Sequence, residues 1–213
     1  FGTNAASAIN TCITRTVNEP SDGRVIIKGA ATDYAVGTTQ ITVPSNVTIT
    51  GDKGAVIQGT RPFLLKSKSA LEHVTIEGTA GAFDLVSYDG DDIRIQDVTF
   101  QGRGNAIGSW DDPGSATNHK RLSVLNNFAN GLIIPSVSSF AFEFRKGTED
   151  FRIEDNDILI AGSGPPPNGI FLNGASSAGI VLNGILTYNS QVIRTIIRGN
   201  KIRAVPGGTV GVG

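Results

Sequence analysis

A short segment that ends in glycine recurs along the chain, and it constrains the fold more than any other feature. It ends at Gly51, Gly78, Gly102 and Gly131, so the spacings are 27, 24 and 29 residues. The four copies read Val-Thr-Ile-Thr-Gly, Val-Thr-Ile-Glu-Gly, Val-Thr-Phe-Gln-Gly and Asn-Phe-Ala-Asn-Gly. A period of about 20–50 residues is typical of solenoids, propellers and arrays.

Each unit consists of β-branched and aromatic segments separated by Gly, Asn and Asp, which favours short strands over helices. One unit cannot bury its apolar face alone, whereas stacked units bury a continuous core. The sequence therefore predicts an all-β fold, a parallel β-helix that forms one domain over residues 1–213. We expect a cap segment at residues 1–20 and the coils at residues 24–213.

The segment 4–17 is the best helix candidate. Ala5, Ala8, Ile9, Cys12 and Ile13 recur at helical spacing and predict one apolar face. A solenoid exposes the end of its core, and an amphipathic helix covers such an end. We therefore expect an N-terminal capping α-helix.

Composition excludes several classes of protein. The net charge is −1 and the pI is near 6.1, so no basic surface for nucleic acid is predicted. No run of 18 apolar residues is present, so no membrane span is predicted. With two histidines and the single Cys12, no metal site is predicted, and no internal disulfide can form.

The order of the N-terminal segments resembles the opening of a known superfamily. The segments are Phe1-Gly2, Ala8-Ile9, Asp22–Ile27, Ile41–Gly51 and Val56-Ile57. This order is similar to that of the pectate-lyase superfamily, which includes phage tailspike depolymerases and polygalacturonase-like enzymes. The resemblance implies a right-handed parallel β-helix and a polysaccharide as the partner. One departure is that only residues 3–7 separate Phe1-Gly2 from the helix, which is shorter than usual in that superfamily.

Asparagines recur at one corner of successive coils. They are Asn126 or Asn127, Asn156 and Asn200, and the last two lie 44 residues apart, which fits two coils of 22. Asn tolerates left-handed backbone angles and can hydrogen-bond its neighbour one coil away. We predict an asparagine ladder inside a turn; ligand binding is the alternative.

Two dense carboxylate groups are candidate catalytic residues, namely Asp91 with Asp92, and Asp111 with Asp112. Glycoside hydrolysis needs two carboxylates, one protonated and one ionised. Gly90-Asp91-Asp92 resembles the paired-aspartate motif of polygalacturonases, but the other motifs of that family are absent. Ordinary use as turn residues is the alternative.

The longest polar loop is predicted from Ser109 to Arg121, and it holds the only tryptophan. Trp110 would be a platform for a sugar ring, and His119, Lys120 and Arg121 would bind hydroxyls or carboxylates. A surface loop without a ligand is the alternative reading of this segment.

A strand is predicted over residues 139–146, where Phe140, Phe142 and Phe144 alternate with polar residues. Glu143 and Arg145 are expected to point outward, either as a plain charged face or as substrate-binding residues. In a uronate lyase, Arg145 with Asp150 or Asp155 would act with calcium; otherwise no cofactor is expected.

Three functions are compatible with these features. The first is a virion-type module, such as a phage tailspike or fibre, that binds a surface polysaccharide. The second is a polysaccharide depolymerase, either a hydrolase or a lyase, and the third is a structural scaffold. The segment 205–213 shows no cap, so we expect either that further chain follows or that another subunit covers this end, and the second would fit a homo-oligomer such as the trimers of tailspike-like proteins. The expected location is extracellular or in a virion.

Overall fold

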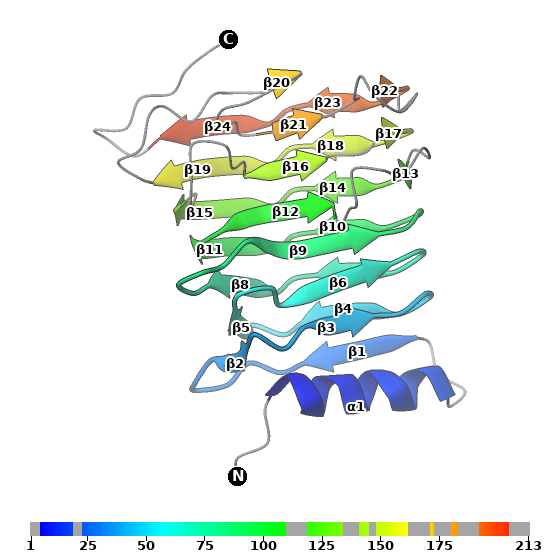
Figure 1. The fold of residues 1–213 in the computed structure, drawn as a ribbon, viewed down its shortest axis with the longest axis vertical. Coiled ribbons are helices and arrows are strands. Elements are labelled where there is room, and N and C mark those ends of the chain that lie inside the picture. Colours follow the sequence, from blue (N-terminus) through cyan, green and yellow to red (C-terminus); the bar gives the residue numbers. More distant parts are fainter. Residues whose placement is uncertain are drawn as a thin grey trace.

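A computed structural model gives the structure of this chain. It describes residues 5–18, 23–109, 119–133, 141–144, 148–161, 171–172, 180–182 and 192–204. In these residues strands predominate, and one helix lies at the N-terminal end (Figure 1).

Helix α1 (Ala5–Asn18) lies against the first strands and covers the end of the core (Figure 1). Its buried residues are Ala6, Ile9 and Ile13. The predicted helix is confirmed, but part of the predicted face is wrong. Ala8 and Cys12 are exposed, because the buried stripe follows the spacing of Ala6, Ile9 and Ile13.

Three parallel seven-stranded sheets form the body of the molecule. Sheet A holds β1 (Arg24–Ile27), β4 (Thr48–Gly51), β7 (Ala70–Glu72), β10 (Arg94–Gln96), β14 (Ser123–Leu125), β18 (Arg152–Glu154) and β23 (Ile196–Arg198). Sheet B holds β2 (Tyr34–Gly37), β5 (Val56–Gly59), β8 (Thr75–Gly78), β11 (Thr99–Arg103), β15 (Phe128–Ile133), β19 (Asp157–Ala161) and β24 (Lys201–Ala204). Sheet C holds β3 (Ile41–Val43), β6 (Phe63–Lys66), β9 (Asp84–Asp89), β12 (Asn105–Ser109), β16 (Phe142–Phe144), β21 (Ile180–Leu182) and β20 (Phe171–Leu172). A small sheet D holds β13 (His119–Lys120), β17 (Thr148–Glu149) and β22 (Val192–Ile193).

The chain visits sheets A, B and C in turn, and up to β19 each pass adds one strand to each of these sheets (Figure 1). Sheet C then gains both β20 and β21 before the chain returns to sheets A and B with β23 and β24. We call one such set of strands a rung. Successive rungs pair in parallel, as where Ile95 of β10 lies between Leu71 of β7 and Val124 of β14. These three side chains are fully buried, and so are their counterparts in sheets B and C. Each fully buried aliphatic side chain contributes about 1.5–3 kcal/mol, so the stacked interior is the main source of stability.

The glycine-terminated repeat is only partly confirmed. Gly78 and Gly102 are direct neighbours in sheet B, and the next strand in that row ends at Gly59. Gly51 lies in sheet A instead, where it pairs with Ile27. The interpretation of Gly51 as the first member of this row is therefore wrong. Strands of every sheet need the same apolar alternation, so the pattern alone does not distinguish one sheet from another.

The asparagine ladder is confirmed, with Asn127 as its first member. The Asn156 Oδ1 accepts hydrogen bonds from both the backbone N–H and the side-chain amide of Asn127, each at 2.9 Å. Asn200 Oδ1 accepts the same pair from Asn156, at 3.1 and 2.8 Å. Because their strands β18 and β23 are direct neighbours, one pass of the chain separates the two residues, and the prediction of two coils of 22 residues is wrong. Asn127 and Asn156 are 1 % exposed, so the ladder lies inside the corner between sheets A and B.

Candidate functional site

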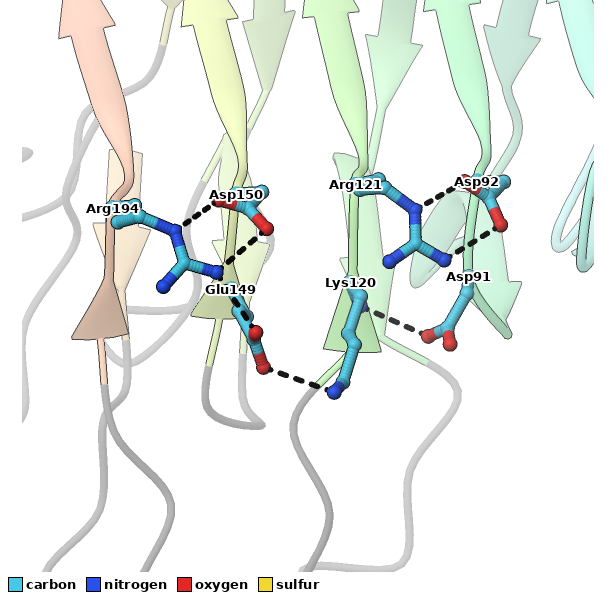
Figure 2. A network of polar contacts seen from close by, with 7 residues as sticks. All are labelled: Asp91, Asp92, Lys120, Arg121, Glu149, Asp150 and Arg194. Atoms are coloured by element: carbon cyan, nitrogen blue, oxygen red, sulfur yellow. Dashed lines mark hydrogen bonds and ion pairs between the residues drawn. The ribbon is translucent and has the colours of Figure 1, made fainter.

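The structure brings several predicted site residues together at one corner of the rungs. Asp91, Asp92, Lys120 and Arg121 lie where the chain enters sheet A, and we call the group there the charged corner (Figure 2). Its other members are Glu149, Asp150 and Arg194, from the next two rungs. Trp110, Asp111, Asp112 and Arg145 lie outside the described residues.

Opposite charges alternate up the charged corner. Arg121 Nη2 donates to Asp92 Oδ2 at 2.8 Å, and Arg194 Nη2 donates to Asp150 Oδ2 at 2.9 Å (Figure 2). Lys120 Nζ lies 3.1 Å from Glu149 Oε2. Each cation therefore has a carboxylate partner on an adjacent rung.

The backbone of this corner is left-handed. The φ angles are 59° at Asp92, 56° at Arg121, 58° at Asp150 and 46° at Arg194. Positive φ is uncommon outside glycine, so four stacked cases mark one turn geometry repeated on four rungs. Backbone bonds join these turns, for example from Arg121 N to Glu149 O at 2.8 Å. The four charged side chains therefore project from turns whose backbones are hydrogen-bonded to one another.

Ion pairing sets the protonation of the corner. The hydrogen bond from Arg121 lowers the pKa of Asp92, and that from Arg194 lowers the pKa of Asp150. The hydrogen bond from Lys120 likewise lowers the pKa of Glu149. A general acid needs a raised pKa, so this environment suits a structural ion pair better than proton donation. The geometry of Asp91 and Asp92 thus favours turn use, and their catalytic role stays a prediction.

His119 is placed in the interior. It belongs to strand β13, is 6 % exposed, and its ring lies 5.1 Å from the ring of Tyr88. The predicted loop therefore does not extend to Arg121, because His119 and Lys120 form a strand. His119 is therefore an interior residue of β13, and its role in substrate binding stays a prediction.

The prediction that Glu143 belongs to an exposed charged face is wrong. All three residues of β16 are buried, and Glu143 is 5 % exposed. Its flanking residues Phe142 and Phe144 enter the core, so Glu143 faces the other side of sheet C. That outer side is therefore buried here, which alternation alone could not predict.

Glu143 belongs to a group on the outer side of sheet C that we call the polar crease: Asp84, Ser87, Asn105, Gly108 and Glu143. Asp84 pairs with Asn105 and Ser87 with Gly108 on adjacent strands, and Gly108 pairs with Glu143 on the following one. Asn105 Nδ2 donates to Asp84 Oδ1 at 2.9 Å. The crease therefore spans three rungs.

Gly108 makes room for the Asp84 carboxylate. A Cβ atom at position 108 would lie 2.2 Å from Asp84 Cγ and 2.4 Å from both of its oxygens. Glu143 follows Gly108 one strand away, at a spacing of about 4.8 Å between neighbouring strands. The glycine thus brings the Asp84 carboxylate over the middle strand, next to the strand that bears Glu143.

Two polar atoms of the crease lack hydrogen bonds among the described residues. They are Ser87 Oγ and Asn105 Oδ1, on residues that are 0 % and 4 % exposed. A buried polar atom without a partner costs about 1–3 kcal/mol. Such exceptions are few in native proteins, and strain, a catalytic role, or a bound water or ion explains them.

An exposed aromatic ring borders the crease. Phe83 directly precedes Asp84 and is 60 % exposed, the highest value among the large apolar side chains of the described residues. The guanidinium carbon of Arg61 lies over this ring, 5.4 Å from its centroid. The backbone N–H of Asn105 donates to Phe83 O at 2.9 Å, which ties the aromatic position to the crease.

Sequence reasoning missed most of this group. Asp84 interrupts the apolar segment from Phe83 to Val86, and a charged residue in such a segment could have marked it as a candidate site residue. Ser87 and Asn105 carried no signal, because only the pairing of β9 with β12 brings them together.

Other candidate sites are limited. A shallow groove of about 380 Å³ lies between α1 and β3, with Ile13, Val17 and Pro44 in its lining. The described residues contain no group of three or more His, Cys, Asp or Glu side chains that could hold a metal ion. Within the same part of the chain, no helix has the length and apolar character needed to cross a membrane.

Comparison with known proteins found no matching family model, no matching curated protein and no matching solved structure. The polar crease is consequently the feature from which a function is proposed.

Proposed function

We propose that this chain is a right-handed parallel β-helix module of a virion surface protein, such as a phage tailspike or fibre, and that it binds a polysaccharide at the polar crease. Three parallel sheets entered in turn support the β-helix, as does the resemblance of the N-terminal segments to the pectate-lyase superfamily. An extracellular or virion location and assembly into a homo-oligomer, such as a trimer, belong to the same proposal.

One observation carries the assignment of the site. Among the described residues, the buried Ser87 hydroxyl and Asn105 amide oxygen have no hydrogen-bond partner. They lie on the neighbouring strands β9 and β12, where Asn105 pairs with Asp84. Sugars are dense in hydroxyl groups, which both donate and accept hydrogen bonds. A sugar in the crease would therefore satisfy groups that are otherwise costly to bury.

The test is binding to a panel of bacterial polysaccharides by affinity electrophoresis. Asp84→Asn and Gly108→Ala should each weaken binding by about tenfold or more, because each disturbs the carboxylate in the crease. The matched control is Asp92→Asn at the charged corner, which should bind like the unchanged protein. Equal binding by all three variants would remove the crease from the proposal.

A depolymerase is the second candidate, and the carboxylates of Asp84 and Glu143 favour it. They lie on the same buried face, with one strand between the two that bear them. Hydrolysis needs two carboxylates, about 5 Å apart for retention and about 6.5–9.5 Å apart for inversion.

An activity assay separates the candidates. New reducing ends that disappear in both Asp84→Asn and Glu143→Gln would establish a hydrolase at the crease. Absorbance of unsaturated products would instead indicate the lyase alternative with Arg145 and calcium. A folded protein that neither binds nor cleaves any member of the panel would favour the structural scaffold.

A further inference from the structure

Strands β23 and β24 are the edge strands of sheets A and B, at the end of the stack away from α1 (Figure 1). We call residues 193–203 the edge rung. Its inward side chains Ile197 and Ile202 are only partly buried, whereas their neighbours on the rung below, Ile153 and Ile158, are 0 % exposed. An edge strand also presents backbone groups that can pair with a further strand. The edge rung therefore offers an apolar surface together with hydrogen-bonding groups.

The asparagine ladder is incomplete at Asn200. Asn127 and Asn156 each donate a backbone N–H and an amide N–H to the asparagine Oδ1 of the following rung. Asn200 donates its amide to Ile153 O at 2.7 Å, but its backbone N–H has no acceptor among the described residues. A ligand that continues the ladder would present a carbonyl or carboxylate oxygen to this group.

Two further backbone donors of the edge rung repeat this situation. On the rung below, Asp150 N and Asp155 N donate to carbonyl groups of the edge rung, at 2.9 and 3.1 Å. The matching groups are Arg194 N and Gly199 N, which take left-handed backbone angles as Asp150 and Asp155 do. Within the part of the chain that the structure describes, neither has an acceptor. Three N–H groups of the edge rung thus lack the acceptors that a further rung supplies elsewhere in the stack.

The charge of the edge rung is entirely positive, and its four exposed cations are Arg194, Arg198, Lys201 and Arg203. The arginines pair with carboxylates of the rung below, as where Arg203 Nη2 donates to Asp157 Oδ2 at 2.8 Å. Lys120, inside the stack, has carboxylates on both sides. Its backbone N–H donates to Asp91 Oδ1 at 2.9 Å, and its Nζ lies 3.1 Å from Glu149 Oε2. By this pattern the edge rung is complementary to carboxylates on its other side.

The later part of the chain cannot supply these carboxylates. Asp157 is the last acidic residue of the sequence, so residues 158–213 hold four cations and no acidic side chain. Residues 1–157 hold 14 cations and 19 acidic side chains. The two parts therefore carry net charges of +4 and −5, and the edge rung lies in the positive part.

A second copy of this chain does not complement the edge rung either. Two copies joined by their edge rungs would place cations against cations, which is unfavourable. A copy joined by its other end would present α1, which has no acidic residue within Ala5–Asn18. The charges therefore favour a partner of different sequence.

We propose that the edge rung binds an acidic β-strand segment of a different protein, which adds one further rung to the stack. In such strand addition, backbone hydrogen bonds give affinity and alternate side chains give specificity. The apolar side chains of the segment would cover Ile197 and Ile202, and its carboxylates would lie beside Arg194 and Arg203. Residues 149–158 show the required pattern, because they already stack on the rung with Lys120 and bring Glu149 to it.

The experiment uses the full chain and a fluorescent synthetic peptide with the sequence of residues 148–161. We expect saturable binding by fluorescence anisotropy, weakened about tenfold by Arg194→Gln and also by 0.5 M sodium chloride. The matched control is Arg121→Gln, which removes a cation from the same column inside the stack and should leave peptide binding unchanged. Thermal melting checks that both variants fold. Absence of binding up to about 1 mM peptide would overturn the proposal.

A second peptide separates strand addition from attraction by charge alone. It carries Phe151→Ser, Ile153→Ser and Ile158→Ser, so it keeps every charge but loses the apolar side chains that face the core. It should bind at least about tenfold more weakly. Equal binding would indicate a site for any acidic polymer and would overturn strand addition.

Sedimentation of the protein alone tests the remaining occupant. Self-association that Arg194→Glu abolishes would assign the edge rung to a second copy and would also overturn the proposal. None of these outcomes depends on the polar crease, so polysaccharide binding stands or fails by its own test.

Discussion

The turns at the two ends of the sheet A strands share left-handed backbone angles but carry different side chains. At one end Asp92, Arg121 and Asp150 take left-handed backbone angles and carry exposed charges. At the other end Asn126 and Asp155 take such angles, and the residue after each is a buried asparagine of the ladder. The difference teaches that backbone geometry fixes where a polar ladder can form, while burial decides whether it is neutral or charged.

The largest effect is expected from breaking the neutral ladder. Asn156→Ala removes an acceptor for two donors of Asn127 and a donor to Val124 O. Each buried group left without a partner costs about 1–3 kcal/mol, so we expect a loss of about 3–5 kcal/mol in the free energy of unfolding. Urea denaturation measures it. The exposed neighbour Asn126→Gly is the control, and an equal loss there would contradict the comparison.

Asn156→Asp puts a charge into the neutral ladder. The new carboxyl group would face Val124 O and Asn200 Oδ1, which now accept hydrogen bonds from the amide. These acceptors and the burial raise a carboxyl pKa above its unfolded value. A raised folded pKa gives stability that is present at low pH and lost as pH rises. The melting temperature of the variant should therefore be closest to that of the unchanged protein in acid, which thermal melting from pH 3 to 8 would show. A difference in melting temperature that is the same at every pH would contradict a raised pKa in the variant.

The charged corner should show the opposite dependence on pH. The pKa values of Asp92, Glu149 and Asp150 are lowered by their cationic partners. The unfolded pKa values are 3.8 for Asp and 4.5 for Glu, and the folded values lie below them. The stability that these ion pairs add is therefore fully present above the unfolded pKa values and is lost as the pH falls through the folded ones. The melting temperature should thus fall below about pH 4, and less so in Asp150→Asn. An identical fall in both proteins would place the acid sensitivity elsewhere.

The smallest effect is expected for Arg121→Gln, which removes one exposed ion pair and retains the turn. Exposed pairs contribute little because water and salt screen them. The change in melting temperature should be a small fraction of that in Asn156→Ala and should vanish in 0.5 M sodium chloride. A loss as large as that of Asn156→Ala would contradict the expectation that the charged corner stabilises the fold less than the asparagine ladder does.

The predictable parts of this molecule depend on spacing within one strand or one corner. The recurrence of asparagine at one corner predicted the ladder, and the apolar periodicity located the helix. The spacing argument failed, because the 44 residues from Asn156 to Asn200 form one pass of the chain and not two coils of 22. Gly51 was assigned to the wrong sheet because its segment has the alternation that every sheet requires. Which sheet a strand joins depends on the path of the chain between strands, and residue type does not encode that path.

The candidate site was harder to predict because it depends on what covers each face. The alternation of apolar and polar residues predicts that Glu143 is exposed, but it is buried because the outer side of sheet C is buried at this level. Asp84 and Gly108 are related only by the position of the Asp84 carboxylate over the glycine. Such relations join residues more than 20 positions apart, so they need the register of β9 with β12.

The alternating signs at the charged corner also limit how this chain can change its length. Lys68, Asp92, Arg121, Asp150 and Arg194 follow one another up the stack, so each sign has the opposite sign as its neighbour. Deletion of the rung with Arg121 would stack Asp92 on Asp150. Removal of two adjacent rungs would restore unlike neighbours. The charged corner therefore favours duplications and deletions of an even number of rungs, because these keep unlike charges next to each other.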